Sequence, residues 1–557
     1  MLTYLRNNKK EIYLLLAVFV VFLTLRLPGV HLPYHQDEYK SAIATEQGSE
    51  AAGNFFAHPP LTQFIFHAAY DFFGGENLRL FPIVFSSLSF FLLYYYLRKR
   101  AGQKTALIGV SLFTLCIYSV WGSLQLDTDG AVIPFFFLLA LCVYEHAKDC
   151  WSTQRRYVWL GALALVCLLG FLVKLSFILV VGAIIADFLL EHRHKVSKKH
   201  VLYGGVGVIV FLLISVFLIF IINHIYPAFR IDSMIKHALY FAHFSGRDYV
   251  QVIIQGSKAL FYLSPLLLLP PLLISKDIFK KTRIQFLYII LGLIFYLILL
   301  DFSHGALDKY FGYLILPLCS ISASVISVYS QSFSFKKYRG PVILAGVTGL
   351  IVLFLNFFPH DVVPLYPKTD WFGKVFSLRW NFLNPFMGGS GPLGFYVSFL
   401  MIALAFITSA AAVIAGFIRK QWKEGMLLVL IAVGCVYNVV FIEELLFGKI
   451  NGSSKEVLEE SLGFISSSSS IKSVITYNDS GAYELHHMEK YKARFYAVPA
   501  FGDAHKPLFE EHNGYFLVVG IPLISPHFFH GQFFTGCDTV YQSTSGKITA
   551  YVYDCKK

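Results

Sequence analysis

The stretch "IYLLLAVFVVFLTLRL", Ile12–Leu27, decides the fold class, because it is an apolar run long enough to approach the width of a bilayer. Similar runs recur as far as residue 447. Only 14% of the 557 residues are charged, whereas a soluble chain carries roughly a quarter. No small-residue cleavage site follows the first run, so we predict a retained helix rather than a signal peptide. The sequence therefore predicts a polytopic α-helical membrane protein.

Short basic clusters between the apolar runs predict the topology. Segments such as "RKRAGQK" and "EHRHKVSKKH" fall between alternate runs, as expected for cytoplasmic loops. This distribution explains the net charge of +12 without a nucleic-acid partner. From a cytoplasmic N-terminus we predict 13 transmembrane helices, near 12–30, 79–98, 105–121, 131–147, 158–173, 175–190, 201–226, 259–275, 284–300, 310–332, 341–357, 393–418 and 426–447. The odd number places the C-terminus outside the cytoplasm.

The composition changes after residue 447, and we predict two domains. Residues 1–447 would form the transmembrane domain and residues 448–557 a small extracytoplasmic α/β domain. In the tail, "KEVLEESLGFI" is typical of an amphipathic helix, and "YFLVVGIPLI" and "KITAYVYDC" are typical of strands. Cys537 and Cys555 of this tail fit either a disulfide in an oxidising compartment or two free thiols.

Acidic and isolated basic residues gather in the predicted outer loops. The first outer loop holds "YHQDEYKSA", Tyr34–Ala42, and then "HPPLTQFIFHAAYDFFGG", whose aromatic and proline content favours short interfacial helices. Asp127 and Asp129 precede the fourth predicted span, and Lys174 lies at the turn after the fifth. A carboxylate near single cations at membrane depth suits a reaction between a hydroxyl-bearing acceptor and an anionic lipid.

Five motifs in order resemble the membrane glycosyltransferases that use polyprenyl-phosphate sugars, of the protein O-mannosyltransferase and aminoarabinose (lipid A) transferase type. They are "DEYKSA", "HPPLTQFIFHAAYDFFGGENLRLFP", "LQLDTDGAVIPFFFLLAL", "LLGFLVKLSFILV" and "DKYFGYLILPL". The N-terminal 200 residues carry most of the resemblance and the tail almost none. Lys309 stands where the family more often has arginine, which leaves the donor's head group open.

The resemblance implies an inverting glycosyltransferase that moves a sugar from a polyprenyl-phosphate carrier to an extracytoplasmic protein, lipid or glycan. Asp37 would be the catalytic base, assisted by Glu38. Asp127 and Asp129 would be auxiliary acids, one of which holds Lys174 or a divalent ion. The donor phosphate would be held by four residues: Lys174, Lys309, Tyr310 and Arg79. The protein would lie in the plasma (inner) membrane.

Other interpretations of these residues stay open. Glu38 equally fits a helix-capping role, and acids at 127 and 129 also suit a helix N-terminus. Arg79 fits a purely architectural ion pair. A divalent metal is a further option, with Glu38, His58 and His304 as candidate ligands in no diagnostic spacing; no other cofactor is indicated.

Two other function classes fit part of the pattern. A transporter or flippase of a lipid-linked saccharide would also place cations at membrane depth, but it predicts charged or broken helices at mid-membrane. An inactive relative that scaffolds an envelope assembly through its tail is the third alternative. The sequence leaves open the sugar, the acceptor, the oligomeric state and the role of the tail.

Overall fold

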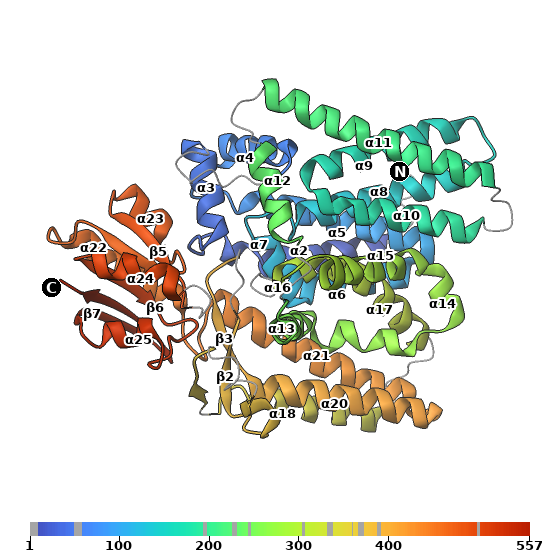
Figure 1. The fold of residues 1–557 in the computed structure, drawn as a ribbon. Coiled ribbons are helices and arrows are strands. Elements are labelled where there is room, and N and C mark those ends of the chain that lie inside the picture. The colour runs from blue at the N-terminus through green and yellow to red at the C-terminus, as the bar shows by residue number, and fades with distance from the viewer. Residues whose placement is uncertain are drawn as a thin grey trace. The chain divides into compact units, whose positions relative to one another are not determined.

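The computed structural model describes residues 9–48, 58–192, 198–225, 231–242, 247–302, 307–330, 338–358, 360–365, 373–386, 391–497 and 502–556. The chain, drawn as a ribbon in Figure 1, divides into two compact units. The first consists of Met1–Val30, Ile43–Leu263 and Leu267–Ser332. The second consists of His31–Ala42, Ser264–Leu266 and Phe333–Lys557. The helix α3 (Asp37–Gln47) begins in the second unit and ends in the first.

The first unit is built from helices in its described parts. They are α2 (Lys9–Thr24), α4 (Pro60–Phe73), α5 (Leu80–Ala101), α6 (Gln103–Leu115), α7 (Ile117–Leu124), α8 (Val132–Asp149), α9 (Arg155–Val173), α10 (Ile178–Glu191), α11 (Lys198–Ile225), α12 (Ile231–Tyr240), α13 (Tyr249–Leu268), α14 (Lys276–Lys281), α15 (Arg283–Ile294), α16 (Leu307–Tyr310) and α17 (Ile315–Tyr329). The short helices α3 and α4 occupy the predicted first outer loop.

The helical membrane class is confirmed, but the count of 13 spans is not. In the described ranges, 7 helices are long and apolar enough to cross a membrane, or 8 if a bent pair counts as one span. The bent pair replaces the predicted straight span 105–121: α6 ends at Cys116, whose backbone is extended, and α7 leaves at 64°. Other predicted spans correspond to helices shorter than a bilayer crossing, such as Arg339–Phe354.

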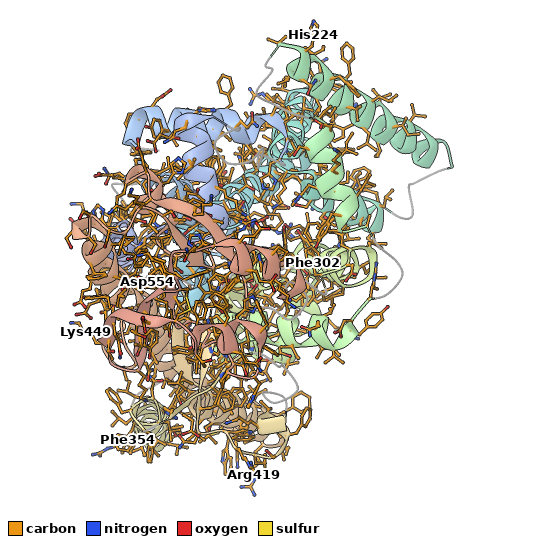
Figure 2. All side chains as sticks on the ribbon, turned by 60° about the vertical axis from the view of Figure 1, so that its left-hand side comes forward. His224, Phe302, Phe354, Arg419, Lys449 and Asp554 are labelled. Atoms are coloured by element: carbon orange, nitrogen blue, oxygen red, sulfur yellow. A yellow bond between two sulfur atoms is a disulfide. The ribbon has the colours of Figure 1, made fainter. Side chains whose placement is uncertain are left out.

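Large apolar side chains project outward from several of the long helices. In the first unit, Phe217 on α11 is 64% exposed. In the second unit, Phe354 on α18 (Arg339–Phe354) and Phe417 on α20 (Phe399–Ile418) are 63% and 70% exposed. Phe354 is labelled in Figure 2. Apolar surface on this scale is unfavourable in water and is expected where helices face lipid tails.

Ion pairs join several helix ends within the first unit. They link the C-terminal ends of α5, α8 and α10 and the start of α15, through Arg100–Glu145 (3.0 Å), Lys99–Asp149 (2.5 Å), Lys148–Glu191 (2.7 Å) and Arg283–Asp187 (2.7 Å). Predicted cytoplasmic clusters therefore meet at one end of this unit. Helix α8 separates that end from the residues before Val132 by roughly 27 Å, at 1.5 Å per residue.

The second unit combines helices with two sheets. Its described elements after α13 are α18 (Arg339–Phe354), β1 (Asp361–Val362), β2 (Phe382–Phe386), β3 (Phe395–Ser398), α20 (Phe399–Ile418), α21 (Lys423–Leu446), α22 (Ser454–Ser467), β4 (Val474–Tyr477), α23 (Ala482–His487), β5 (Tyr491–Phe495), α24 (Gly502–Glu511), β6 (Tyr515–Val519), α25 (Phe529–Phe534), β7 (Asp538–Ser545) and β8 (Ile548–Asp554). The smaller sheet has the order β1-β2-β3.

The larger sheet lies wholly within residues after 447 and has the order β5-β4-β6-β8-β7. Strands β4, β5 and β6 are parallel, and β8 runs antiparallel to both β6 and β7. Alternate residues of β6 supply two apolar cores: Leu517 packs with α22 on one face, and Phe516 packs with Phe509 and Phe534 on the other. The strand predicted at 515–524 is present only as far as Val519, as β6, and the strand predicted at 547–555 is present as β8. The predicted boundary at residue 447 stays a prediction.

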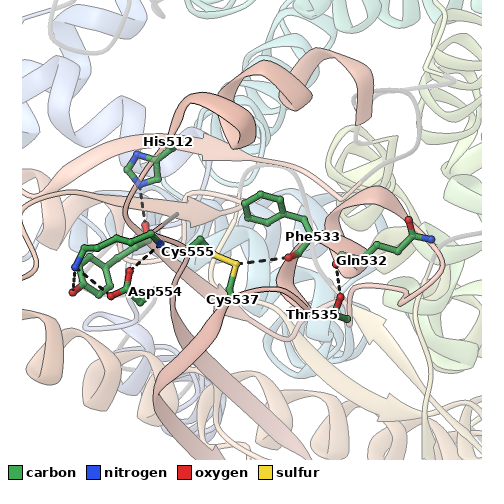
Figure 3. The surroundings of a disulfide bond; sticks show 9 residues. His512, Gln532, Phe533, Thr535, Cys537, Asp554 and Cys555 are labelled. Atoms are coloured by element: carbon green, nitrogen blue, oxygen red, sulfur yellow. Dashed lines mark hydrogen bonds and ion pairs between the residues drawn. A yellow bond between two sulfur atoms is a disulfide. The ribbon is translucent and has the colours of Figure 1, made fainter.

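Cys537 and Cys555 form a disulfide that connects the turn before β7 to the end of β8 (Figure 3). Their Cα atoms lie 4.6 Å apart. Of the two alternatives that the sequence left open, the structure contains the bonded one. The bond ties together the two strands at one edge of the sheet.

Candidate functional site

Four buried charges meet in the first unit, where three helical segments end or begin. Asp127 and Asp129 lie in the turn between α7 and α8, Lys174 caps α9, and Lys309 lies in α16. Each is less than 10% exposed. Lys309 pairs with Asp127, and Lys174 pairs with Asp129. Buried charges are costly unless paired, so these four form one self-neutral group, the charge cluster.

The turn that carries the two aspartates is held tightly against α7. A Cβ atom on Gly130 would lie 2.2 Å from the carbonyl oxygen of Gly122, so only glycine fits there without a backbone shift. Arg79 reinforces the same turn: its Nη1 donates to the carbonyl oxygen of Leu124, 2.5 Å away, at the end of α7. The side chain of Arg79 is fully buried. This contact gives Arg79 a structural role at the turn, while its two predicted roles, an ion pair with an outer-loop acid and a contact with the donor phosphate, stay predictions.

Both lysines of the charge cluster lie near the ring of Tyr310. Lys174 Nζ is 5.0 Å from the centre of the Tyr310 ring, and Lys309 Nζ is 5.5 Å from it. Both distances fall within the range of a cation–π contact. Two ammonium groups therefore lie within 5.5 Å of one ring centre, and two cations that close together can bind one anion.

A pocket adjoins the charge cluster through Asp129 and Tyr310. Its polar rim is formed by tyrosines and one serine, and its remaining wall is apolar. The lining residues are Asp129, Ser176, Tyr288, Tyr296, Tyr310, Tyr313, Ile133, Pro134, Phe137, Gly312 and Leu316. An apolar wall with a few converging polar groups is the usual composition of a small-molecule site.

His58 adjoins the charge cluster at Asp127. Its Nε2 lies 4.0 Å from Asp127 Oδ1, and its ring is 6.2 Å from the ring of His237. Burial and the neighbouring Lys174 ammonium lower the pKa of His58 below its usual range, so the imidazole is neutral at pH 7. A neutral imidazole is compatible with either packing or ligation. No group of three or more His, Cys, Asp or Glu suited to a metal occurs within the described ranges, and His304 lies outside them.

The proposed catalytic acids belong to the second unit. Asp37 and Glu38 form the first turn of α3, where carboxylates are favoured by the helix dipole. The Asp37 side chain is 29% exposed and its Oδ1 accepts a hydrogen bond from Lys40 Nζ at 3.3 Å. Glu38 is fully buried. Asp37 is thus accessible and partnered by a cation, while Glu38 is enclosed by protein.

Sequence reasoning missed several buried charges within the first unit. Asp308, next to Lys309, pairs with Lys258 at 3.7 Å, and its carbonyl oxygen accepts from the Tyr118 hydroxyl. The "DK" pair at 308–309 was the available signal, because two adjacent charges open an apolar span. Arg26, inside the first apolar run, is fully buried and donates to Ser119 and Ser123 Oγ, both at 2.9 Å.

Comparisons with known proteins agree with the motif order. Residues 57–220 match the dolichyl-phosphate-mannose-protein mannosyltransferase family. The fold resembles ArnT from Cupriavidus metallidurans in the apo state, with a TM-score of 0.53 at 15% identity over 98% of each chain. It equally resembles the same ArnT bound to undecaprenyl phosphate, with a TM-score of 0.53 at 14% identity over 97% of each chain. No curated protein sequence matches the chain significantly.

The matched range 57–220 contains His58, the aspartate turn and Lys174, whereas Asp37 and Lys309 lie outside it. The two ArnT comparisons extend over nearly the whole chain and concern the fold. The resemblance inferred from the motifs is confirmed over residues 57–220, less than a third of the chain, which are similar to the dolichyl-phosphate-mannose-protein mannosyltransferases.

Proposed function

We propose that this protein is a membrane glycosyltransferase that transfers a sugar from a polyprenyl-phosphate carrier to an acceptor outside the cytoplasm. The observation that carries the proposal is the pair of buried lysines that both contact the ring of Tyr310, a residue that also lines a tyrosine-rich pocket. The family match at 57–220 and the ArnT fold, which also binds undecaprenyl phosphate in that relative, support the same chemistry.

In this proposal, Lys174 and Lys309 hold the donor phosphate. A sugar phosphodiester carries one negative charge, and ammonium groups bind phosphate oxygens as point charges. Since Asp127 and Asp129 neutralise both lysines at rest, the arriving phosphate displaces carboxylate contacts rather than meeting unpaired cations. Tyrosines of the pocket provide ring surface and hydroxyl groups for the sugar.

Asp37 acts as the general base in the transfer step. Its carboxylate takes the proton of the acceptor hydroxyl while that oxygen attacks the anomeric carbon of the sugar. The bond from the anomeric carbon to the phosphate oxygen breaks, and polyprenyl phosphate leaves with both bonding electrons, stabilised by the lysines. One displacement of this kind inverts the anomeric centre. Glu38, enclosed at the start of α3, supports the position of this turn.

The proposed orientation of the protein in the membrane rests on the charges at the two ends of α8. The helix ends that carry Arg100, Lys148 and Arg283 would face the cytoplasm, in line with the positive-inside rule. The charge cluster, at the opposite end of α8, would then face the outer leaflet. The tail would lie outside, where a disulfide such as Cys537–Cys555 persists.

The test is sugar transfer by the full-length protein in lipid nanodiscs. The donors are undecaprenyl phosphates carrying radiolabelled mannose, glucose or aminoarabinose, and the acceptor is an envelope fraction from cells that lack the protein. Wild type is expected to label the envelope from at least one donor, and Asp37→Asn to lose about 10²-fold or more in kcat. The matched control is Asp71→Asn, which removes an exposed carboxylate of α4.

Three results would contradict the proposal. Equal transfer by wild type and Asp37→Asn would remove the assignment of the base. Movement of the labelled lipids between leaflets, without any sugar transfer, would favour the flippase alternative. Absence of both transfer and movement, with intact envelope assembly in cells carrying Asp37→Asn, would favour a scaffold.

A further inference from the structure

The segment that carries Asp37 packs against the tail within the second unit. The Tyr34 ring meets the ring of Tyr483 edge-on, with centroids 4.9 Å apart. The Tyr39 ring lies 5.3 Å from the ring of Tyr491. Tyr34 and Tyr39 are each only 5% exposed. Residues almost 450 positions apart in the sequence therefore share one aromatic contact surface.

Tyr491 belongs to a cluster of polar contacts inside the tail. Its hydroxyl donates to Asp479 Oδ1 at 2.8 Å, and Arg494 Nη1 donates to Asp479 Oδ2 at 2.9 Å. Asp479 is fully buried and follows β4 in a left-handed turn, with φ of 58°. Asp479, Tyr491 and Arg494 are called the Asp479 cluster below. Since both carboxylate oxygens are bound, the Tyr491 ring is held in a fixed place on β5.

The charges of Asp479 and Arg494 act electrostatically on Tyr39 and Lys40, two residues close to Asp37 in the sequence. Burial lowers the pKa of Lys40, and the Arg494 guanidinium lowers it further, against the opposing effect of the Asp37 and Asp479 carboxylates. Burial raises the pKa of Tyr39 to about 12, and the Asp479 carboxylate contributes. The tail thus contacts Tyr39 through a ring and influences Lys40 through charge. These two residues follow Asp37 within one helical turn.

We propose that the Asp479 cluster is a positioning device for Asp37, acting through the Tyr39 ring and the Lys40 ammonium. The inference rests on the proposed function, in which Asp37 is the base. None of the three cluster residues would touch donor or acceptor. The tail would then contribute to the rate of the chemical step, because a catalytic group displaced by about 1 Å costs up to ~10²-fold in rate.

The first test measures the segment itself and needs no substrate. Hydrogen–deuterium exchange is followed by mass spectrometry on the full-length protein in nanodiscs. Tyr491→Phe keeps the ring and removes its bond to Asp479, and Asp479→Asn weakens both bonds. Each variant is expected to raise exchange in residues 37–42 by about tenfold, since this turn loses its fixed neighbour. Exchange in β6 (Tyr515–Val519) should stay at the wild-type rate.

The matched control is Tyr541→Phe, which removes a phenolic hydroxyl from β7, at the opposite edge of the same sheet. It should leave residues 37–42 unchanged. Unchanged exchange at 37–42 in both Tyr491→Phe and Asp479→Asn would overturn the proposal. Faster exchange across the whole tail, including β6, would also overturn it, because the cluster would then serve only the stability of the tail.

The second test measures transfer in the nanodisc assay with the same three labelled donors. Tyr491→Phe and Asp479→Asn should lower kcat by about tenfold with an unchanged KM for the donor, since the donor-binding residues are untouched. In an Asp37→Asn background, the same changes should lower the residual rate no further. Equal losses in both backgrounds would overturn the proposal. If wild type transfers nothing, the proposed function fails, while the exchange experiment still decides whether the cluster holds this segment.

Discussion

The buried pair of Lys309 and Asp127 allows its effect on stability and its proposed effect on donor binding to be tested together. Lys309→Met leaves the Asp127 carboxylate without its closest cation, in a place that is only 6% exposed. Loss of one partner of a buried pair costs about 3–5 kcal/mol. We therefore expect a lower unfolding temperature and weaker binding of undecaprenyl phosphate, measured by thermal unfolding and by native mass spectrometry.

The double variant Asp127→Asn/Lys309→Met separates the two effects. Removing both charges leaves no uncompensated group, so the unfolding temperature should return toward that of wild type. Binding of undecaprenyl phosphate should stay weak, because the ammonium is still missing. Full recovery of binding in the double variant would show that Lys309 matters to the site only as a partner of Asp127.

The lowered pKa of His58 predicts that the free energy of unfolding depends on pH. Its pKa is lowered in the folded protein, while the unfolded chain titrates near the usual value of about 6.5. The unfolded state therefore binds more protons below pH 6.5, and stability falls as the pH drops from that value. The loss between pH 6.5 and 5 is at most about 2 kcal/mol.

Unfolding temperatures between pH 8 and 5 check this expectation. His58→Gln should flatten the decline below pH 6.5, because glutamine does not titrate. His224→Gln, at the exposed end of α11 in Figure 2, is the control and should leave the wild-type curve unchanged. Parallel curves for His58→Gln and wild type would contradict the assignment.

At the scale of elements, the turn between α7 and α8 is the feature that places both aspartates. Gly130→Ala would bring a Cβ to 2.2 Å from the Gly122 carbonyl oxygen, so the turn must move. We expect loss of undecaprenyl phosphate binding together with a lower unfolding temperature. Gly161→Ala in α9, where nothing lies within 4 Å, should instead be neutral or stabilising by about 0.5–1 kcal/mol. Similar effects of both substitutions would argue against a special role of the turn.

The sequence was sufficient to predict the helical membrane class and the position of the charged motifs at the ends of helices. Both depend on local features, namely the length of the apolar runs and the charges that interrupt them. The pairing of the buried charges was predicted only in part: the sequence pointed to Asp127 or Asp129 as a partner of Lys174, and Asp129 is that partner. The contact of Asp127 with Lys309 was missed, because it depends on how separate helix ends converge. The break at Cys116 was also missed, since neither proline nor glycine marks it. The contact of Tyr39 with Tyr491 is set by tertiary packing alone.

At the scale of the whole molecule, the disulfide offers a joint test of tail stability and location. Its cysteines are 18 positions apart, and closing a loop of about this length stabilises by roughly 3 kcal/mol. Cys537→Ser/Cys555→Ser should make the tail more sensitive to added protease in the full-length protein. In intact cells the wild-type pair should react with a maleimide only after reduction. Reaction without a reductant would contradict an oxidising location.

The self-neutral charge cluster has a consequence for product inhibition. Transfer converts a phosphodiester with one negative charge into a monoester that carries close to two, so the spent carrier should bind two lysines more tightly than the fresh one. In the proposed mechanism, Asp127 and Asp129, which pair with the two lysines, would compete with the carrier phosphate for them and favour its release. Asp129→Asn should therefore raise affinity for undecaprenyl phosphate and lower steady-state turnover, while the first turnover stays fast in a burst measurement. In such a site, the two carboxylates beside the lysines would determine the rate at which the spent carrier dissociates, and therefore the rate at which the next donor can bind.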